Sequence, residues 1–255
     1  MSGNATEKRR HKLAEMLISE GSLRVGVLSE RLGVSTETIR KDLLSLEEKG
    51  IVRKSHGSAV PASTFLEIER SMERKSHENT EIKNRIAQAA AELIPERGMV
   101  LLDTGSTVYS LARLLYLKKG LHIFTNAVTN VQAVAGSDNE IYLIGGKFRS
   151  TSMASVGMWG MDILSSINAD IVFLGTDGFA GSSGPCTASY DEAEVKTAMI
   201  RAARTRVVVS DSSKMSITSL FKFCDWSMID HLITDGDVDA HTLDKLRNQV
   251  NVIVV

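Results

Sequence analysis

Short apolar runs rich in β-branched residues alternate with helix-like stretches through most of the chain, and this alternation restricts the fold more than any other feature. The runs are Met99–Leu102, Leu121–Phe124, Ile141–Ile144, Ile171–Leu174, Val207–Val209, His231–Ile233 and Asn251–Val255. Buried strands separated by helices are typical of a parallel sheet whose faces are covered by helices. The pattern therefore predicts an α/β domain with a mainly parallel sheet over residues 82–255.

Loops of small, hydroxylated and charged residues follow five of these runs. They begin at Asp103, Thr125, Gly145, Gly175 and Ser210, and two of them contain a lysine, Lys147 or Lys214. Turns are generally rich in Gly, Ser and Asp, which accounts for any one of these loops but less easily for five in succession. In an open parallel sheet the carboxyl ends of the strands share one edge, where ligands bind. We therefore expect a ligand site at that edge.

The loop Asp103-Thr104-Gly105-Ser106-Thr107 is the strongest candidate among them, because it leads from a strand into a helix. Glycine permits close approach of the backbone, the hydroxyls add donors, and the N–H groups and dipole of a helix N-terminus favour an anion. A phosphate group fits such a loop. The spacings of a P-loop and of a GxGxxG dinucleotide loop are both missing, which disfavours an ATPase or an NAD-dependent enzyme.

The first sixty residues follow a different pattern. Helical spacing from about Glu7 to Glu20 precedes a short extended piece, a helix stopped by Gly33, and a third helix that Ser35 can cap. The third helix carries the apolar stripe Ile39, Leu43 and Leu46, and residues 51–54 and 59–60 read as two strands around a turn. This order predicts a helix-turn-helix followed by a β-wing.

The exposed face of the third helix and the wing offer cations and hydroxyls, which suit phosphate and base-edge contacts in DNA. Any one of these cations, taken alone, is most simply explained as a solvated surface charge. Their joint placement on one helix and the adjacent hairpin favours the interpretation that they contact DNA. Glu37 fits this role less well, and Leu44 is a candidate for contact with a partner subunit. The candidate DNA-binding residues are Ser35, Thr36, Thr38, Arg40, Lys41, Arg53, Lys54 and His56.

The charge of the chain divides at Pro61. Overall, 30 Lys and Arg nearly balance 31 Asp and Glu, but residues 1–60 hold 11 against 8, a net +3, and the remainder holds 19 against 23, a net −4. Residues 61–81 mix Ser, Thr and opposite charges and read as a linker and lead-in. We therefore predict a DNA-binding domain over 1–60, a linker over 61–81 and a second, acidic α/β domain over 82–255.

Cysteine motifs, signal peptides and membrane-spanning segments indicate where a protein resides, and this sequence shows none of them. Cys186 and Cys224 form no CxxC or Cys/His spacing, so we expect neither a disulfide framework nor bound zinc. The polar start of the chain does not resemble a signal peptide, and no run approaches the roughly 20 apolar residues of a spanning helix. We expect a cytoplasmic protein without a membrane partner, a metal or a cofactor.

Residues 32–60, LGVSTETIRKDLLSLEEKGIVRKSHGSAV, resemble the winged helix-turn-helix of the DeoR family of bacterial transcription regulators. The pattern of that family is matched by Ser35, Thr38, Ile39, Arg40, Lys41, Asp42 and Leu43. Residues from about Arg74 to Asp235 resemble the sensor domain of the family, which is similar in fold to ribose-5-phosphate isomerase. This resemblance implies that residues 82–255 form an effector-sensing domain and that a phosphorylated sugar or sugar acid is the ligand. The candidate effector-binding residues are Asp103, Thr104, Gly105, Ser106, Thr107, Asn126, Gly145, Gly146, Asp177, Glu194, Lys196 and Lys214.

The leading hypothesis is that the chain is a transcriptional regulator, and more specifically a repressor of a carbohydrate or sugar-acid operon. In this hypothesis the repressor leaves operator DNA when its effector binds. A sugar-phosphate isomerase is the alternative, with Asp177, Glu194 and Lys196 or Lys214 moving a proton. The helix-turn-helix disfavours that enzyme, and an RNA-binding or architectural protein leaves the ligand loops unexplained. Because one helix-turn-helix reads only a few base pairs, we expect a homo-oligomer.

Overall fold

The chain divides into two compact units, Met1–Ile68 and Glu69–Val255, and each is described here by itself. The computed structural model describes residues 6–255 except 7, 11, 15, 18–22, 49–51, 56–57, 62–71 and 180. It describes the backbone alone at residues 47–48, 52–55, 58–61 and 73–74.

The first unit combines helices with a small antiparallel sheet. The described residues between Thr6 and Leu17 are helical, and they are followed by β1 (Leu23–Arg24), α2 (Val25–Leu32), α3 (Thr36–Glu48), β2 (Val52–Ser55) and β3 (Ser58–Pro61). The expected helix-turn-helix and wing are confirmed. The extended piece at Leu23 is itself part of the wing, because it pairs with Ala59 and gives a sheet of order β1-β3-β2.

A single apolar cluster holds this unit together. The expected stripe of α3, Ile39, Leu43 and Leu46, is buried against Leu13 and Leu17 of the N-terminal helical segment, and Leu28 of α2 completes the cluster. The helix spacing seen in the sequence therefore corresponds to the packed face of each helix.

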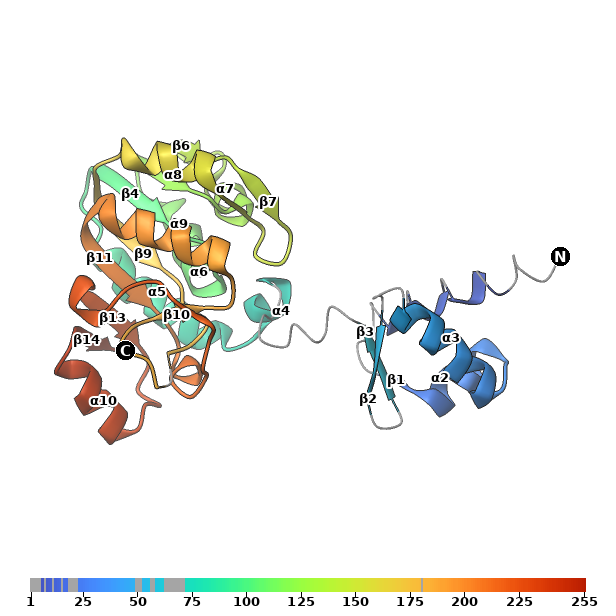
Figure 1. The fold of residues 1–255 in the computed structure, drawn as a ribbon. Coiled ribbons are helices and arrows are strands. Elements are labelled where there is room, and N and C mark those ends of the chain that lie inside the picture. The colour runs from blue at the N-terminus through green and yellow to red at the C-terminus, as the bar shows by residue number, and fades with distance from the viewer. Residues whose placement is uncertain are drawn as a thin grey trace. The chain divides into compact units, whose positions relative to one another are not determined.

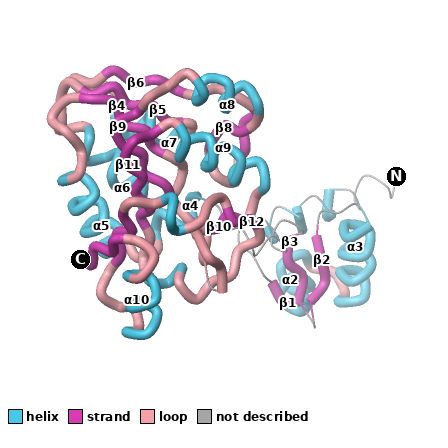
Figure 2. The backbone as a smooth tube through the Cα atoms, turned by 60° about the vertical axis from the view of Figure 1, so that its left-hand side comes forward, coloured by secondary structure: helices cyan, strands magenta, loops and turns pink. Residues whose placement is uncertain are grey.

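The second unit is built on a seven-stranded sheet of order β14-β13-β11-β9-β4-β5-β6, in which every neighbouring pair is parallel (Figures 1 and 2). Its strands are β4 (Gly98–Leu102), β5 (Leu121–Thr125), β6 (Glu140–Leu143), β9 (Ala169–Leu174), β11 (Ala203–Val209), β13 (His231–Thr234) and β14 (Asn251–Val254). All seven runs identified in the sequence are strands of this sheet, so the predicted fold class is confirmed.

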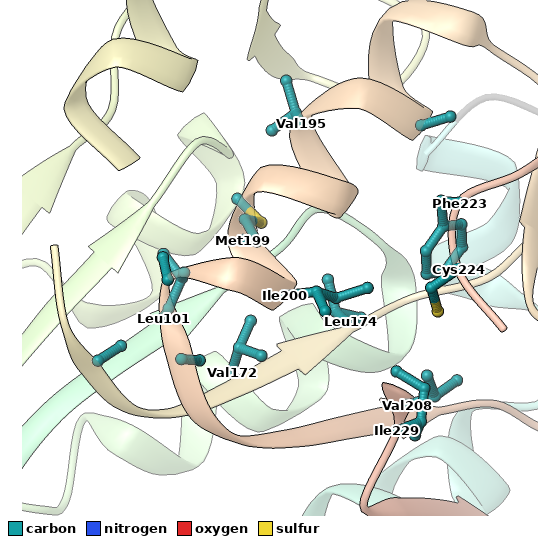
Figure 3. Packing of buried hydrophobic residues seen from close by; sticks show 14 of the residues in the cluster. Leu101, Val172, Leu174, Val195, Met199, Ile200, Val208, Phe223, Cys224 and Ile229 are labelled. Carbon is teal, nitrogen blue, oxygen red and sulfur yellow. The ribbon is translucent and has the colours of Figure 1, made fainter. Parts of the chain in front are cut away.

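Helices cover both faces of the sheet. One face packs against α5 (Thr80–Glu92), α6 (Ser106–Leu115) and α7 (Val128–Val134), and the other against α8 (Met158–Ser165) and α9 (Tyr190–Arg201). Figure 3 shows the second layer, where Met199 and Ile200 of α9 lie over Val172 and Leu174 of β9. The remaining helical elements are α4 (Met72–His77), α10 (Ala240–Arg247) and the 3-10 turns η2 (Ser212–Lys214) and η3 (Trp226–Met228).

Two short antiparallel pairs lie outside the main sheet and were not expected from the sequence. They are β7 (Lys147–Arg149) with β8 (Ala154–Val156), and β10 (Cys186–Thr187) with β12 (Phe221–Lys222). The loop Gly145-Gly146, expected at the ligand edge, leads into β7 instead. Gly146 has a φ of 154°, and a Cβ there would lie 2.5 Å from the Val156 carbonyl oxygen, so this glycine lets the two strands approach.

Candidate functional site

The sheet reverses its order between β4 and β9, and this reversal creates the main site. The helix after β4 is α6, on one face of the sheet, whereas the helix after β9 is α9, on the opposite face. The connections that leave these two neighbouring strands therefore diverge, which opens a crevice at their carboxyl ends.

A polar pocket occupies this crevice. It draws on the loops after β4, β9 and β11, on helices α4 and α9, and on the turn before β8. Its lining consists of Met72, Lys75, Thr104, Gly105, Ser106, Thr107, Thr151, Ser152, Gly175, Thr176, Asp177, Thr187, Glu192, Lys196, Val209, Ser210, Asp211 and Lys214. Hydroxyls, lysines and carboxylates dominate the lining, so the pocket suits a small polar ligand that carries charge.

A buried ion pair forms the floor of the pocket. Lys196 Nζ of α9 contacts Asp103 Oδ2 at the end of β4, and it donates a hydrogen bond to the Gly175 carbonyl oxygen at 3.1 Å. The Gly175 N–H donates to Asp103 Oδ2 at 3.0 Å, so this pair joins β4, β9 and α9. Burial opposes the charge on Lys196, but the carboxylates of Asp103, Glu192 and Asp177 outweigh it and raise the Lys196 pKa.

Asp177 lies on the wall of the pocket and is held from two sides. Its Oδ1 contacts Lys75 Nζ at 2.6 Å, and its Oδ2 accepts hydrogen bonds from the Thr187 hydroxyl at 2.9 Å and the Ala188 N–H at 3.0 Å. Burial favours the neutral acid, but the Lys75 charge and hydrogen bond outweigh it and lower the Asp177 pKa to about 2. Asp177 is therefore an anion at neutral pH.

Glu192, one turn before Lys196 on α9, is a further buried anion of the lining. Its Oε1 contacts Arg149 Nη1 of β7 at 3.1 Å, and its Oε2 lies 3.1 Å from the Thr187 hydroxyl. The β7–β8 pair thus supplies a cation to this wall. Asp177 and Glu192 of the lining are thus each paired with a cation.

The N-terminus of α6 opens into the pocket as the sequence suggested. Gly105 precedes the helix with a φ of 135°, and no side chain within the described residues caps the helix. The Thr104 hydroxyl donates to the Ser152 carbonyl oxygen at 2.7 Å, which fastens the loop to the turn before β8. The first N–H groups of α6 and the hydroxyls of Ser106 and Thr107 form a donor set suited to an anion.

The candidate effector residues separate into two groups. Thr104, Gly105, Ser106, Thr107, Asp177, Lys196 and Lys214 line the pocket, and Asp103 lies directly behind it. Asn126, Gly145, Gly146 and Glu194 do not line it. Asn126 is buried and donates to the Ser155 carbonyl oxygen at 3.0 Å, so it anchors β8 to the sheet.

Glu194 lies on a different face of α9 from the pocket. At about 100° per residue, Glu192 and Lys196 share one helix face, whereas Glu194 lies about 200° from Glu192. It lines a separate hollow with Tyr190 and Thr197. The spacing Glu192–Lys196 could have been read from the sequence as a shared face, but nothing local in the sequence marks Lys75, Arg149 or Thr187.

The first unit presents the geometry of a helix-turn-helix. Gly33 ends α2 in the left-handed conformation with a φ of 64°, and its N–H donates to the Glu30 carbonyl oxygen. The Ser35 hydroxyl accepts a hydrogen bond from the Thr38 N–H at 3.2 Å at the start of α3, as expected for a cap. The turn and the cap together fix where α3 begins.

The candidate DNA-binding residues are placed as follows. Ser35, Thr36, Arg40 and Lys41 are exposed, and Thr38 is half-buried with its hydroxyl 2.9 Å from that of Ser35. Lys41 pairs with Glu37 at 3.0 Å across one helical turn, and both side chains remain exposed. Arg53 and Lys54 lie on β2 with only their backbone described, and His56 lies outside the described residues.

Asp42 of α3 does not face solvent. It is buried and accepts from Arg9 Nε at 2.6 Å and from Arg10 Nε at 2.8 Å. Burial opposes its charge, but these two guanidinium groups outweigh burial and lower the Asp42 pKa. Two of the cations counted in the basic segment therefore have a structural partner.

Three further features bear on what the chain can bind: metal ligands, cysteines and membrane-spanning helices. No group of three or more His, Cys, Asp and Glu is arranged to hold a metal ion within the described part of the chain. Cys186 and Cys224 are buried and free. None of the described helices is long and apolar enough to cross a membrane.

Comparison with known proteins identifies both units. Residues 78–236 match the family described as DeoR C terminal sensor domain, and residues 9–65 match the family described as DeoR-like helix-turn-helix domain. A protein of Escherichia coli O157:H7 named for transcriptional repression of the aga operon is 36% identical over 98% of this chain and 94% of its own length. The lactose phosphotransferase system repressor of Streptococcus mutans is 31% identical over 97% and 98%. Among solved structures, ribose 5-phosphate isomerase A from Methanocaldococcus jannaschii aligns with a TM-score of 0.40 and 17% identity over 54% of this chain and 55% of that one.

Proposed function

This chain belongs to the DeoR family, and we propose that it is a transcriptional repressor that binds operator DNA through its first unit and leaves it when a phosphorylated sugar or sugar acid occupies the pocket of its second. The observation that carries this proposal is the presence, in one chain, of a capped helix-turn-helix with exposed Arg40 and a polar pocket at the switch point of a parallel sheet. Relatives named as repressors, one of them of a lactose phosphotransferase system, support carbohydrate genes as the target.

The pocket supports a phosphorylated effector through its donors. The N-terminus of α6, with Ser106 and Thr107, suits a phosphate group, and Lys214 of η2 adds a cation to the same lining. The carboxylates Asp177 and Glu192 suit the hydroxyls of a polyol. Release of DNA then requires that the effector bind the DNA-free form more tightly, and by linkage DNA weakens effector binding by the same factor.

The DNA-binding part of the proposal is tested at Arg40. Arg40→Ala should weaken binding to a duplex that the wild-type chain selects from a random library, by about 10-fold if Arg40 reads a base. Arg113→Ala, an exposed arginine on α6, is the matched control and should leave DNA binding unchanged. Equal affinity of the Arg40→Ala chain and the wild type in a gel-shift titration would remove α3 from the interface.

The effector part is tested by a thermal-shift screen against phosphorylated sugars and sugar acids, since a ligand that binds only the folded state raises the melting temperature. The active compound should also release DNA. Thr107→Ala and Lys214→Ala should each raise the concentration needed for release. Unchanged release by both variants would place the effector elsewhere.

Three further features belong to the same proposal. Homo-oligomerisation would let two helix-turn-helix units read two half-sites, and light scattering of the full chain tests it. Action on the DNA of a prokaryotic cell would place the protein in the cytoplasm. The isomerase alternative is tested by a direct assay on pentose phosphates, in which we expect no turnover.

A further inference from the structure

The helices α8 and α9 lie side by side on one face of the sheet, and their outer surface carries an apolar hollow (Figures 1 and 2). The hollow has a volume of about 660 Å³. Met161 and Leu164 of α8 line one side of it, and Ala193 and Ala198 of α9 line the other. Because the side chains from α9 are short, α9 leaves a recess beside α8 rather than a filled groove.

Large apolar side chains stand next to this hollow on α8. Met158 is 70% exposed, Trp159 is 76% exposed and Ile163 is 42% exposed, so Trp159 alone leaves roughly 200 Å² of its surface in water. At about 100° per residue, Met161 and Ser165 lie on the flank of α8 that faces the hollow, and Trp159 and Ile163 lie on the opposite flank. One exposed apolar residue is ordinary, but three on a single helix beside an apolar hollow mark an interaction surface. We call this surface the α8–α9 face.

The α8–α9 face is complementary to itself, which points to a second copy of this chain as its partner. A two-fold axis parallel to α8 brings the Trp159 flank of each copy onto the hollow of the other, so one surface supplies both the projection and the recess. Tryptophan and methionine are also the residue types enriched where protein surfaces pair.

The charges of the α8–α9 face are complementary as well. Asp162 of α8 and Arg201 of α9 are both exposed, and neither forms an ion pair within the part of the chain that the structure describes. Asp162 lies on the crest of α8, between Met158 and Trp159 in the helical projection, and Arg201 lines the hollow. The same two-fold axis therefore brings Asp162 of each copy toward Arg201 of the other.

Pairing through this face leaves the effector pocket open. Glu192 and Lys196 of α9 line that pocket, and Arg201 lies about 180° around the helix from Glu192. A second copy on the α8–α9 face thus meets α9 from the side opposite to the effector.

We propose that two copies of this chain pair through the α8–α9 face, with Trp159 of each copy in the hollow of the other and Asp162 paired with Arg201 across the interface. This inference rests on the proposed function, in which two helix-turn-helix units read two half-sites. It names the surface that holds these two units in one assembly.

The first test removes the apolar anchor from the full-length chain. Trp159→Glu should raise the dissociation constant of the pair about 30-fold or more, as for loss of a central interface residue, measured by sedimentation equilibrium over a concentration series. Leu117→Glu is the matched control, because Leu117 is an apolar residue outside this face and is 80% exposed, and it should pair like the wild type. Both side chains are exposed in a single copy, and circular dichroism checks that both variants fold.

The second test reverses charges and separates a contact between copies from a structural effect. Asp162→Arg and Arg201→Asp should each weaken pairing about 10-fold, because each places like charges opposite one another. The double variant restores opposite charges across the interface and should recover most of the affinity, whereas two independent structural defects would add.

Quenching of tryptophan fluorescence follows the same face directly. Trp226 is buried, so acrylamide quenches mainly Trp159 in a single copy, and quenching of the wild type should fall as copies associate. An assembled wild type whose pairing is unchanged by Trp159→Glu, or a double charge variant that recovers nothing, overturns the inference and leaves the proposed homo-oligomer standing with another interface. A wild type that stays monomeric at every concentration, whatever other protein then covers this face, overturns both.

Discussion

At the scale of single residues, the sensor unit is organised by charges that are buried in pairs. Lys196 and Asp103 are 4% and 1% exposed, and each satisfies the other together with the backbone of Gly175. A buried pair of this kind contributes little net stability relative to apolar residues, but removal of one partner leaves an unpaired charge in a low dielectric. The pair therefore specifies how β4, β9 and α9 come together.

Lys196→Met should lower the free energy of unfolding by about 3–5 kcal/mol, because Asp103 then loses its buried partner. Both tryptophans of the chain, Trp159 and Trp226, lie in the second unit, and Trp226 is buried, so urea unfolding followed by tryptophan fluorescence reports on this unit. Lys119→Met, which removes an exposed ion pair with Asp138, is the control and should have no measurable effect. Equal stability of the two variants would contradict a structural role for the pair.

Asp177 should make stability depend on pH in acid. Its pKa in the folded state, about 2, lies below the ordinary value of 3.8, so the ionised carboxylate stabilises the folded chain above pH 4, by about 2 kcal/mol, and this contribution is lost as the pH falls toward 2. Asp177→Asn lacks this contribution. The difference in unfolding free energy between wild type and variant should therefore be constant near neutral pH and shrink below about pH 4. A difference that does not change between about pH 7 and pH 3 would rule out the ion pair as its cause.

Sequence reasoning predicted the single residues of the pocket less completely than it predicted the strands and helices. It located the loop at Asp103 and Lys214, because each follows a strand end, and it took Lys196 from the family resemblance. It missed Lys75 and Arg149, which reach the site from α4 and β7 by packing that connects positions far apart in the chain. It chose Glu194 rather than Glu192, since only the orientation of α9 on the sheet decides which helix face meets the pocket.

At the scale of elements, local patterns predicted the structure wherever one element buries a continuous face. The central strands β4, β9, β11 and β13 carry runs of buried residues, the edge strands β6 and β14 are partly exposed, and the stripe of α3 repeats at helical spacing. The pairs β7–β8 and β10–β12 have two or three residues per strand, and the partners of the second pair are far apart in sequence. Their pairing depends on the completed sheet, which no local pattern encodes.

Gly33 should be required for the turn between α2 and α3. It adopts a left-handed conformation with a φ of 64°, and no atom lies within 4 Å of an added Cβ, so the cost of Gly33→Ala is conformational alone, about 1 kcal/mol. Gly26→Ala is a matched control, because Gly26 lies inside α2 with equally open surroundings, and alanine should there be neutral or stabilising. Hydrogen exchange of α2 and α3 amides in the full chain measures both. Faster exchange in the Gly26→Ala chain than in the Gly33→Ala chain would refute this account of the turn.

At the scale of the whole molecule, the near-zero net charge is the sum of a basic N-terminal segment and an acidic remainder. Residues 1–60 carry a net +3 and the rest a net −4. Within the first unit, Arg9 and Arg10 are bound to the buried Asp42, and Lys41 is paired with Glu37. These pairs reduce the positive charge available for nonspecific attraction to DNA, so affinity has to come from specific contacts such as Arg40 and from more than one helix-turn-helix in each assembly.

The salt dependence of DNA binding tests this division. Each phosphate neutralised by a cation contributes about −0.9 to the slope of log affinity against log salt concentration. The full chain and a truncated chain of residues 1–68 should both show this dependence, and residues 69–255 alone should show none, because that unit is acidic. Arg40→Ala should reduce the magnitude of the slope by about 1 if Arg40 contacts a phosphate, and should relax sequence preference at constant slope if it contacts a base. Fluorescence anisotropy across a salt series measures both quantities. The same salt dependence in residues 69–255 would show that the sensor unit itself binds DNA, against the division that the charges indicate.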